Sequence, residues 1–315
     1  MDTAGNLLLT GEADILVVPG TDNMYNYYLY FNDWGGCRGV DCCATSGGCA
    51  SCCFPQRHAQ PATQCVYTSN HTVVAYKTSD FASFEFLGPV LAASSHAAGT
   101  VFRPHVIFNK LTNKFIMWYE NRFSGQSGYS VAVSKSPAGP FVTTAATVDM
   151  AAHTKIGDFD IFVDEDGSAF HVRTGFAVEE LNANYTGVTG RFTLFTTPAP
   201  AEGPVMFKRN GLFYVMCGKG CCACKGGSNA YVFTATDPLS SWSYGGDAGS
   251  NTSAPFDKHS EYNYPSRAQA SAVTRVGDTY LWMGNQWVTA QEAGHPRNHD
   301  LLYWWPLSFD EDNNV

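Results

Sequence analysis

The chain has 315 residues, of which 44% are hydrophobic, 14% aromatic and only 15% charged, and its formal net charge is −9. It is long enough to bury a large core, and its negative charge argues against a nucleic-acid partner, which would need a basic face. No run of 18 apolar residues occurs, so no segment is expected to span a membrane. The 30 Gly and 15 Pro, with many aromatic and β-branched residues, favour strands and turns over helices.

The cysteines and the N-terminus bear on where the protein resides. Eleven Cys fall within residues 37–65 and 217–224, and their spacing lacks the paired Cys and His pattern of a zinc site. Disulfides in an oxidising compartment are therefore favoured over metal binding, and the odd count leaves one thiol over. Residues 1–15 lack the basic start and long apolar core of a signal peptide, so we expect a secreted protein whose signal peptide is not present in this chain. Three N-glycosylation sequons agree with secretion: Asn70, Asn184 and Asn251.

A loose repeat runs through the chain in five units. Each unit opens with a polar or charged residue and a short apolar strand, continues through a turn, and ends in an aromatic-rich strand. The openings are about 45 to 90 residues apart, which leaves room for two further strands in each unit. The units are residues 13–33, 102–120, 157–175, 201–218 and 266–287.

Five units of about four strands predict an all-β fold, a five-bladed β-propeller that occupies residues 1–315 as a single domain. One four-stranded blade cannot bury both of its faces, whereas blades packed in a ring cover each other. The first strand of each blade is innermost, so the polar residues at the five openings are expected to converge on one pocket. A two-sheet sandwich is the alternative. The Cys-rich insertion at about 34–65 either rims the pocket or only stabilises the fold.

The stretch GDFDIFVDEDGSAF (157–170) is rich in carboxylates. An EF-hand calcium loop would need an Asp or Asn where Phe162 stands and a glycine where Val163 stands, so that interpretation fails. The turn signal Asp-Gly instead predicts a hairpin whose turn, residues 164–167, carries three solvated acids. Asp158 and Asp160 remain, and of these Asp158 lies at the opening of the unit.

Five stretches of the chain carry a family resemblance. They are ADILVVP (13–19), FRPHVIFNKLTNKFIMW (102–118), GDFDIFVDEDG (157–167), AEGPVMFKRNGLFYVM (201–216) and LLYWWPLSF (301–309). In these stretches the chain resembles glycoside hydrolase family 43, and most of all the branch of exo-β-1,3-galactanases. The family is a five-bladed propeller, and the matching stretches occur in the family's order over nearly the whole chain.

The family uses three carboxylates, and the resemblance implies which residues supply them. Asp14 matches the general base, Glu202 matches the general acid, and Asp158 matches the carboxylate that tunes the acid and orients the substrate. Inverting hydrolysis needs the acid to protonate the leaving oxygen and the base to activate a water on the opposite face, with the two groups roughly 6.5–9.5 Å apart. An anion beside the acid raises its pKa, which is the expected task of Asp158.

The chain departs from the family pattern in the first blade. The family's base is followed by Pro, whereas Ile15 follows Asp14 here. In the galactanase branch the usual base is missing and a Gln at the opening of the fifth blade has been given that role, which Gln269 matches. Gln269 is therefore the alternative base or a substrate contact, and Asp14 then only caps a strand. The branch also carries a Glu in the first blade where this chain offers Asn32.

Further polar and aromatic residues are expected to contact a sugar, although each also has an ordinary structural interpretation. His105 could instead accept a backbone hydrogen bond, Arg173 could pair with an acid, and most propeller aromatics wedge between blades. The expected substrate-binding residues are Asn32, His105, Glu120, Arg173 and Trp287.

These observations predict a secreted, monomeric, inverting glycosidase that acts on polysaccharide or oligosaccharide, with β-1,3-galactan or arabinogalactan-type side chains of cell walls as the first candidates. No cofactor and no catalytic metal are required, and a structural calcium ion in the central channel is common in such folds. The alternative is a non-catalytic carbohydrate-binding propeller with a degenerate site, which the departures at Asp14 and Asn32 keep open.

Overall fold

The structure is a computed structural model. It describes residues 1–20, 25–34, 71–96, 99–123, 126–218, 228–248, 268–287, 289 and 300–315. Regular structure in these ranges is almost entirely β-strand, with one short 3-10 helix at Ala93–Ser95. None of the helices in the described ranges has the length and apolar character needed to cross a membrane. The prediction of an all-β fold is confirmed.

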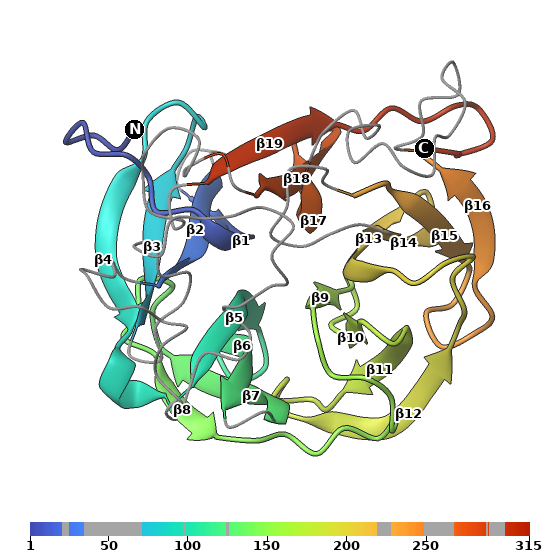
Figure 1. Ribbon diagram of the computed structural model, residues 1–315, viewed down its shortest axis with the longest axis horizontal. Helices are drawn as coiled ribbons and strands as arrows, with labels where there is room; N and C mark the ends of the chain where they lie inside the picture. The colour runs from blue at the N-terminus through green and yellow to red at the C-terminus, as the bar shows by residue number, and fades with distance from the viewer. Residues whose placement is uncertain are drawn as a thin grey trace, which may run out of the picture. The chain divides into compact units, whose positions relative to one another are not determined.

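The strands form five antiparallel sheets, and neighbours in each sheet are consecutive in the chain (Figure 1). The first two sheets contain β1 (Gly11–Pro19), β2 (Tyr25–Asp33), β3 (Thr72–Thr78) and β4 (Glu85–Leu91), followed by β5 (Thr100–Asn109), β6 (Lys114–Phe123), β7 (Gln126–Ser134) and β8 (Val142–Ala145). The next two contain β9 (Phe159–Val163), β10 (Ala169–Arg173), β11 (Ala177–Leu181) and β12 (Val188–Leu194), followed by β13 (Glu202–Arg209), β14 (Leu212–Gly218), β15 (Tyr231–Ala235) and β16 (Ser243–Asp247). The fifth contains β17 (Gln269–Val276), β18 (Thr279–Gln286) and β19 (Leu301–Pro306).

The five sheets correspond to the five repeat units of the sequence. The first two strands of each sheet fall on the predicted hairpins. The strands that follow lie between one unit and the next, and in the fifth sheet β19 follows the last unit. Five successive sheets of three or four antiparallel strands make the fold a five-bladed β-propeller, and the alternative of a two-sheet sandwich is wrong.

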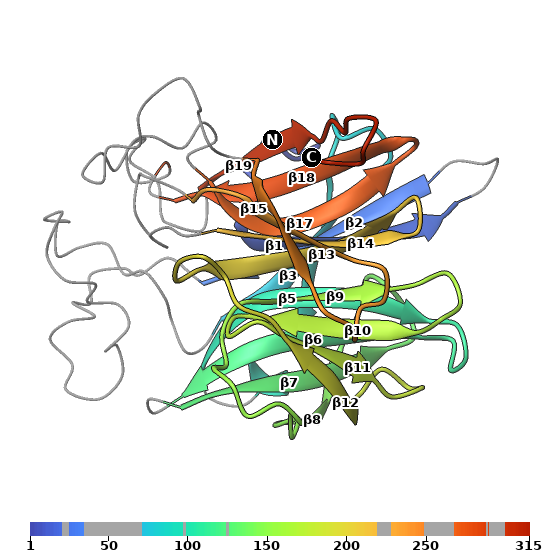
Figure 2. The same ribbon diagram turned by 90° about the vertical axis from the view of Figure 1, so that its right-hand side faces the viewer.

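Contacts within the chain separate two compact units, which are interleaved in sequence. Unit 1 contains Met1–Val106, Met117–Thr147 and Val288–Asp300, and unit 2 contains Ile107–Ile116, Val148–Trp287 and Leu301–Val315. Unit 2 therefore holds the last three sheets. Within it, β13 contacts both β9 and β17, so the first strands of three successive sheets are neighbours (Figure 2). Such contacts are expected of innermost blade strands; the single domain over 1–315 stays a prediction.

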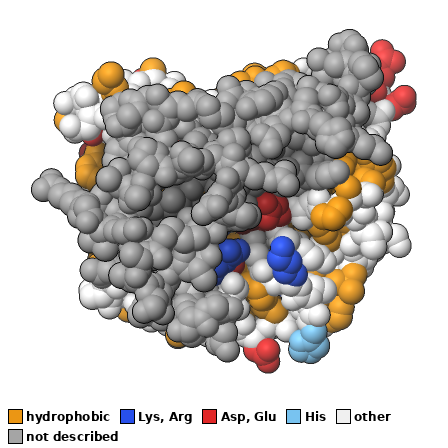
Figure 3. Space-filling model, in the orientation of Figure 1, with side chains coloured by type: hydrophobic (Ala, Val, Ile, Leu, Met, Phe, Trp, Pro, Cys, Tyr) orange, Lys and Arg blue, Asp and Glu red, His pale blue; other side chains and the backbone are white. Residues whose placement is uncertain are grey.

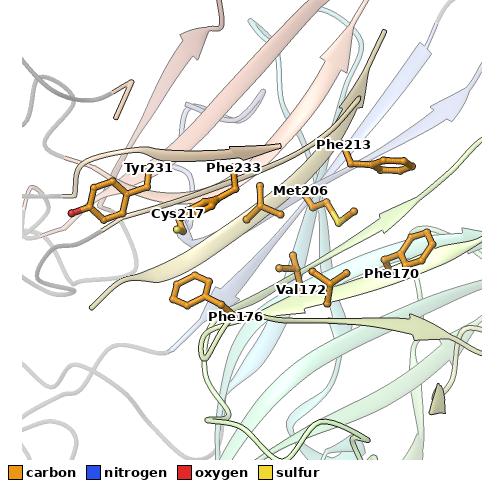
Figure 4. Packing of buried hydrophobic residues seen from close by; sticks show 10 residues of the cluster. Phe170, Val172, Phe176, Met206, Phe213, Cys217, Tyr231 and Phe233 are labelled. Atoms are coloured by element: carbon orange, nitrogen blue, oxygen red, sulfur yellow. The ribbon is translucent and has the colours of Figure 1, made fainter. Parts of the chain in front are cut away.

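Neighbouring sheets of unit 2 are held together by apolar side chains. Phe170 and Val172 of β10 face Met206 of β13 and Phe213 of β14, and the rings interdigitate between the two sheets (Figure 4). Each fully buried side chain of this size stabilises the fold by about 1.5–3 kcal/mol relative to an exposed one.

Cys217 belongs to the same cluster and forms no disulfide. Burial raises the pKa of its thiol well above the usual range, so the thiol is neutral and acts as a small apolar side chain. The other ten cysteines, the Cys-rich insertion and two of the three sequons lie outside the described residues. The predicted disulfides therefore stay a prediction.

The carboxylate-rich stretch forms the predicted hairpin. Ala169 of β10 lies opposite Val163 of β9, and Gly167, with φ of +87°, closes the turn in a conformation that favours glycine. Hydrogen bonds from Ser168 hold the pKa of the exposed Asp166 below its usual value. Asp164 differs from the prediction of a purely solvated turn, because it lies 2.7 Å from the Lys208 ammonium nitrogen on β13.

Candidate active site

The polar residues at the starts of three strands form the candidate site in unit 2. Asp158 immediately precedes β9, Glu202 is the first residue of β13, and Gln269 is the first residue of β17. A hydrogen bond from the Met206 backbone N–H to Asp160 Oδ2, 2.6 Å long, ties the middle of β13 to the beginning of β9. The folding of these sheets therefore brings predicted site residues from three distant parts of the sequence to neighbouring strand ends.

Two side-chain hydrogen bonds join three of the predicted residues. Gln269 donates from Nε2 to Asp158 Oδ2 over 2.9 Å, across 111 positions of sequence. Trp287 donates from its indole Nε1 to Gln269 Oε1 over 2.7 Å. Gln269 and Trp287 are 2% and 3% exposed, so the bond between them is shielded from bulk water, and the bond to Asp158 is partly shielded. Asp158 itself is half-buried, which leaves part of its surface accessible.

Glu202 is placed by a β-bulge. It pairs with Gly218 of β14, while Val205 pairs with Met216, so two residues of β13 stand opposite one residue of β14. The first of these two is Gly203, whose φ of +64° favours glycine, and this explains the Gly after the acid. The bulge takes Glu202 out of the regular alternation of the strand and leaves it half-buried.

In unit 1 the structure brings Asp14 and His105 together. Asp14 Oδ2 accepts a hydrogen bond from the Val106 backbone N–H at 2.8 Å, and Oδ1 lies 3.4 Å from His105 Nδ1. The side chain is buried, and its bond to the neighbouring sheet is of the same kind as that of Asp160 in unit 2. These contacts favour the interpretation in which Asp14 holds a strand; its role as the base stays a prediction.

Arg173 forms a buried ion pair inside unit 2. Its guanidinium donates to Glu179 and to the Ala152 carbonyl oxygen, and no part of it is exposed. Glu179 also accepts hydrogen bonds from the backbone N–H groups of Ala151 and Ala152, at 2.8 and 3.3 Å. The pair therefore anchors the segment that leads into β9, and the predicted sugar contact of Arg173 stays a prediction.

The two remaining predicted sugar contacts lie in unit 1. Glu120 is fully buried, with Oε1 2.7 Å from Arg122 Nε. Asn32, opposite Gly11 in the first sheet, is also fully buried, and its side-chain amide has no hydrogen-bond partner among the described residues. A buried amide without a partner is costly unless something fills that role, which keeps the predicted contact of Asn32 open.

Sequence reasoning did not single out Glu12, which the structure places beside Arg103. The Arg103 backbone N–H donates to Glu12 Oε2 at 2.9 Å, and Arg103 Nε lies 3.9 Å from Oε1. A signal was present: GEADILV (11–17) and GDFDIFV (157–163) share Gly, acid, Asp, Ile and Val in the same order, which pairs Glu12 with Asp158. Neither Asp160 nor Glu179 was assigned a role from the sequence.

Charged side chains of both signs lie among polar and hydrophobic ones on the described part of the face in Figure 3. In the described ranges, no three His, Cys, Asp or Glu side chains gather into a group that could hold a metal ion. The structural calcium ion expected from the resemblance remains a prediction.

The chain was compared with known proteins. The model of the family described as glycosyl hydrolases family 43 matches residues 63–302. A search of curated proteins found no match.

Many solved structures have the same fold, and three of them are described as enzymes that act on β-1,3-linked galactose. A family 43 β-1,3-galactosidase with bound galactodeoxynojirimycin is 20% identical, with a TM-score of 0.73 over 99% of this chain and 94% of that one. An exo-β-1,3-galactanase from Clostridium thermocellum is 22% identical, with a TM-score of 0.73 over 100% and 62%. An exo-β-1,3-galactanase variant from Phanerochaete chrysosporium with β-1,3-galactotriose is 21% identical, with a TM-score of 0.70 over 99% and 63%. The chain thus spans a little under two thirds of the length of the two galactanases.

Proposed function

Since the chain belongs to glycosyl hydrolase family 43 and is a glycoside hydrolase that acts on O-glycosyl bonds, we propose that its substrate is β-1,3-linked galactan and that it inverts the anomeric centre. The proposal is supported by the positions of Asp158, Glu202 and Gln269 at the starts of β9, β13 and β17. Strand β13 contacts both of the other strands, and Gln269 donates a hydrogen bond to Asp158. These are the strand ends at which the family resemblance locates its chemistry.

The choice of substrate is supported by the similar structures. Three of them are described as β-1,3-galactosidase or exo-β-1,3-galactanase, and one was solved with β-1,3-galactotriose. Each aligns with essentially the whole of this chain. A secreted monomer acting on galactan side chains of cell walls is part of the same proposal, supported by the cysteine clusters and by an exposed sequon at Asn184.

The proposed reaction is a single displacement. Glu202 gives its proton to the glycosidic oxygen while the bond between that oxygen and C1 of the sugar breaks. A water molecule forms the new bond to C1 from the opposite face and loses a proton to the base. Asp158 orients the sugar and the acid. The products are a galactose of inverted configuration and a chain shortened at the cleaved bond.

Two candidates for the base follow from the sequence. Asp14 is a carboxylate, but its oxygens face the Val106 N–H and His105. Gln269 is a neutral amide whose oxygen already accepts from Trp287. The variants Asp14→Asn and Gln269→Met separate them: added azide, which can replace the activated water as nucleophile, restores product formation only in the variant that lacks the base.

The experiment for the function uses β-1,3-galactooligosaccharides and follows the anomer of the first product by NMR. The wild type is expected to release α-galactose first, and Glu202→Gln is expected to lower kcat by about 10²–10⁴-fold because the leaving group is no longer protonated. Glu165→Gln, an exposed turn residue, is the matched control and keeps full activity. Initial release of β-galactose would contradict inversion. No release from any galactan, arabinan or xylan would leave the non-catalytic binding propeller as the explanation.

A further inference from the structure

The direction of the Gln269 amide is fixed by chemistry. An indole N–H can only donate, so the atom that faces Trp287 Nε1 must be the amide oxygen. The amide NH2 then points the other way and donates to Asp158 Oδ2. The three side chains therefore form one directed sequence of hydrogen bonds that runs from the indole, through the amide, to the carboxylate.

From this arrangement we propose that Trp287 is a positioning residue for Asp158 and acts through Gln269. The proposal rests on the proposed function, because Asp158 matters only if the site is catalytic. The indole N–H keeps the amide from turning over. Without it, the amide is no longer held at its oxygen, so its side chain can shift and its hydrogen bond to Asp158 is held less firmly. Asp158 is then less well oriented toward the substrate.

The backbone supports this role. Gln269 pairs with Asn285 across β17 and β18, and Trp287 follows two residues later, so one hairpin carries both the amide and the indole that holds it. Gln269 and Trp287 are both nearly fully buried. Water competes little for their hydrogen bond there, so the bond is stronger than it would be at the surface. Asp158 comes from a different sheet, so the bond also joins β17 to the start of β9.

The chain offers a matched control in the same sheet. Trp282 on β18 is also buried, at 5% exposure, and its indole nitrogen has no hydrogen-bond partner among the described residues. Replacing Trp282 by Phe removes an N–H that bonds nothing, whereas replacing Trp287 by Phe removes the N–H that orients Gln269. The two substitutions delete the same atoms from similarly buried indoles.

The kinetic test compares Trp287→Phe, Trp282→Phe, Gln269→Met and the double variant Trp287→Phe/Gln269→Met on a β-1,3-galactooligosaccharide. Trp287→Phe is expected to lower kcat about 10-fold with KM within about twofold, since it removes one hydrogen bond in a chain that ends on a charged group. Trp282→Phe is expected to change kcat by less than about twofold. In the Gln269→Met background, Trp287→Phe should change kcat by less than about twofold as well, because the residue through which it acts is gone.

A second measurement does not depend on activity. In proteins labelled with nitrogen-15 at the indole positions, the Trp287 signal is identified by its absence from Trp287→Phe. Gln269→Met should shift that signal and leave the Trp282 signal in place. Thermal melting of each variant checks that it is folded.

Three results would overturn the proposal: equal losses of kcat in Trp287→Phe and Trp282→Phe, multiplying losses in the double variant, or a Trp287 indole signal that does not respond to Gln269→Met. Failure of the proposed function looks different. In that case the wild type releases no sugar from galactan, while the indole signals still report whether the hydrogen bonds exist.

Discussion

The openings of β1 and β9, GEADILV (11–17) and GDFDIFV (157–163), share four of seven residues and an acid at the second position, yet they differ in the contacts that these residues make. The second acid makes the same kind of hydrogen bond in both places. Asp14 accepts from the Val106 backbone N–H and Asp160 accepts from the Met206 backbone N–H, so each ties its strand to the first strand of the following sheet. Within each unit, this carboxylate replaces a backbone hydrogen bond that two separate sheets cannot make.

The first acid has different partners in the two openings. Glu12, with φ of +44°, lies against Arg103, whereas Asp158 receives the side-chain donor of Gln269. The neighbouring strand differs too. In the first opening, the residues between Gly11 and Asp14 lie opposite the apolar Phe31 of β2. In the second opening, Phe159 pairs with Arg173 of β10. The comparison teaches that the shared sequence pattern determines the strand and the hydrogen bond that the second acid accepts from the next sheet. The contacts of the first acid, Glu12 or Asp158, depend on residues from other parts of the chain.

The largest loss of stability is expected at Arg173, which forms a buried ion pair beside the second opening, where the first opening has the apolar Phe31. Arg173→Met leaves Glu179 buried without its cation, which should lower the free energy of unfolding by about 3–5 kcal/mol. Unfolding in urea measures this. A loss below about 1 kcal/mol would mean that the pair does not anchor the segment before β9.

The next effect concerns the first acid and is read from kcat. Asp158→Asn removes the charge that is proposed to tune the acid and orient the substrate, so we expect a loss of about 100-fold in kcat. Glu12→Gln keeps an acceptor for the Arg103 N–H, so we expect less than about a 10-fold change. Both are measured on the same galactooligosaccharide. Losses of similar size would show that the two acids share a function after all.

Asp14 and Asp160 allow the most direct test of whether the second acid has the same role in both openings. Asp14→Ala and Asp160→Ala each leave a buried backbone N–H without its acceptor, so each should lower the free energy of unfolding by about 1–3 kcal/mol, with similar values for both. Urea unfolding gives both numbers. If Asp14→Asn instead abolishes activity while its stability stays near that of the wild type, Asp14 is the base and the equivalence fails.

The smallest loss of stability is expected at the turn between β9 and β10. Lys208 pairs with Asp164, but its side chain is about a third exposed, so Lys208→Met should lower the free energy of unfolding by about 0.2–1 kcal/mol. The loss should shrink further when urea unfolding is repeated in high salt. A loss unaffected by salt would point to the contact of Lys208 with the Phe213 ring rather than to the ion pair.

Much of the fold could be predicted because its signals are local. Alternating apolar residues and turn residues mark each first hairpin, and the Asp166-Gly167 step marks the turn between β9 and β10. The same reasoning located Asp158 at the opening of its unit, whereas the resemblance to family 43 pointed to Glu202 and Gln269. Neither could supply their partners, because the bonds of Trp287 to Gln269 and of Arg173 to Glu179 depend on the bulges and the packing that set side-chain directions. Asp164 shows the same limit: its turn was predicted and its pairing with Lys208 was not.

Gly218 has a consequence for how the site tolerates change. It stands opposite Glu202, and a methyl group there would collide with the carbonyl oxygen of Asn229 and with Ser228 Cβ. The backbone N–H of Ser228 in turn donates to Ala268, the neighbour of Gln269. The missing side chain at position 218 therefore lets the end of β14 lie close to residues 228 and 229, and even an alanine there would push this segment away, together with the contact it makes beside Gln269.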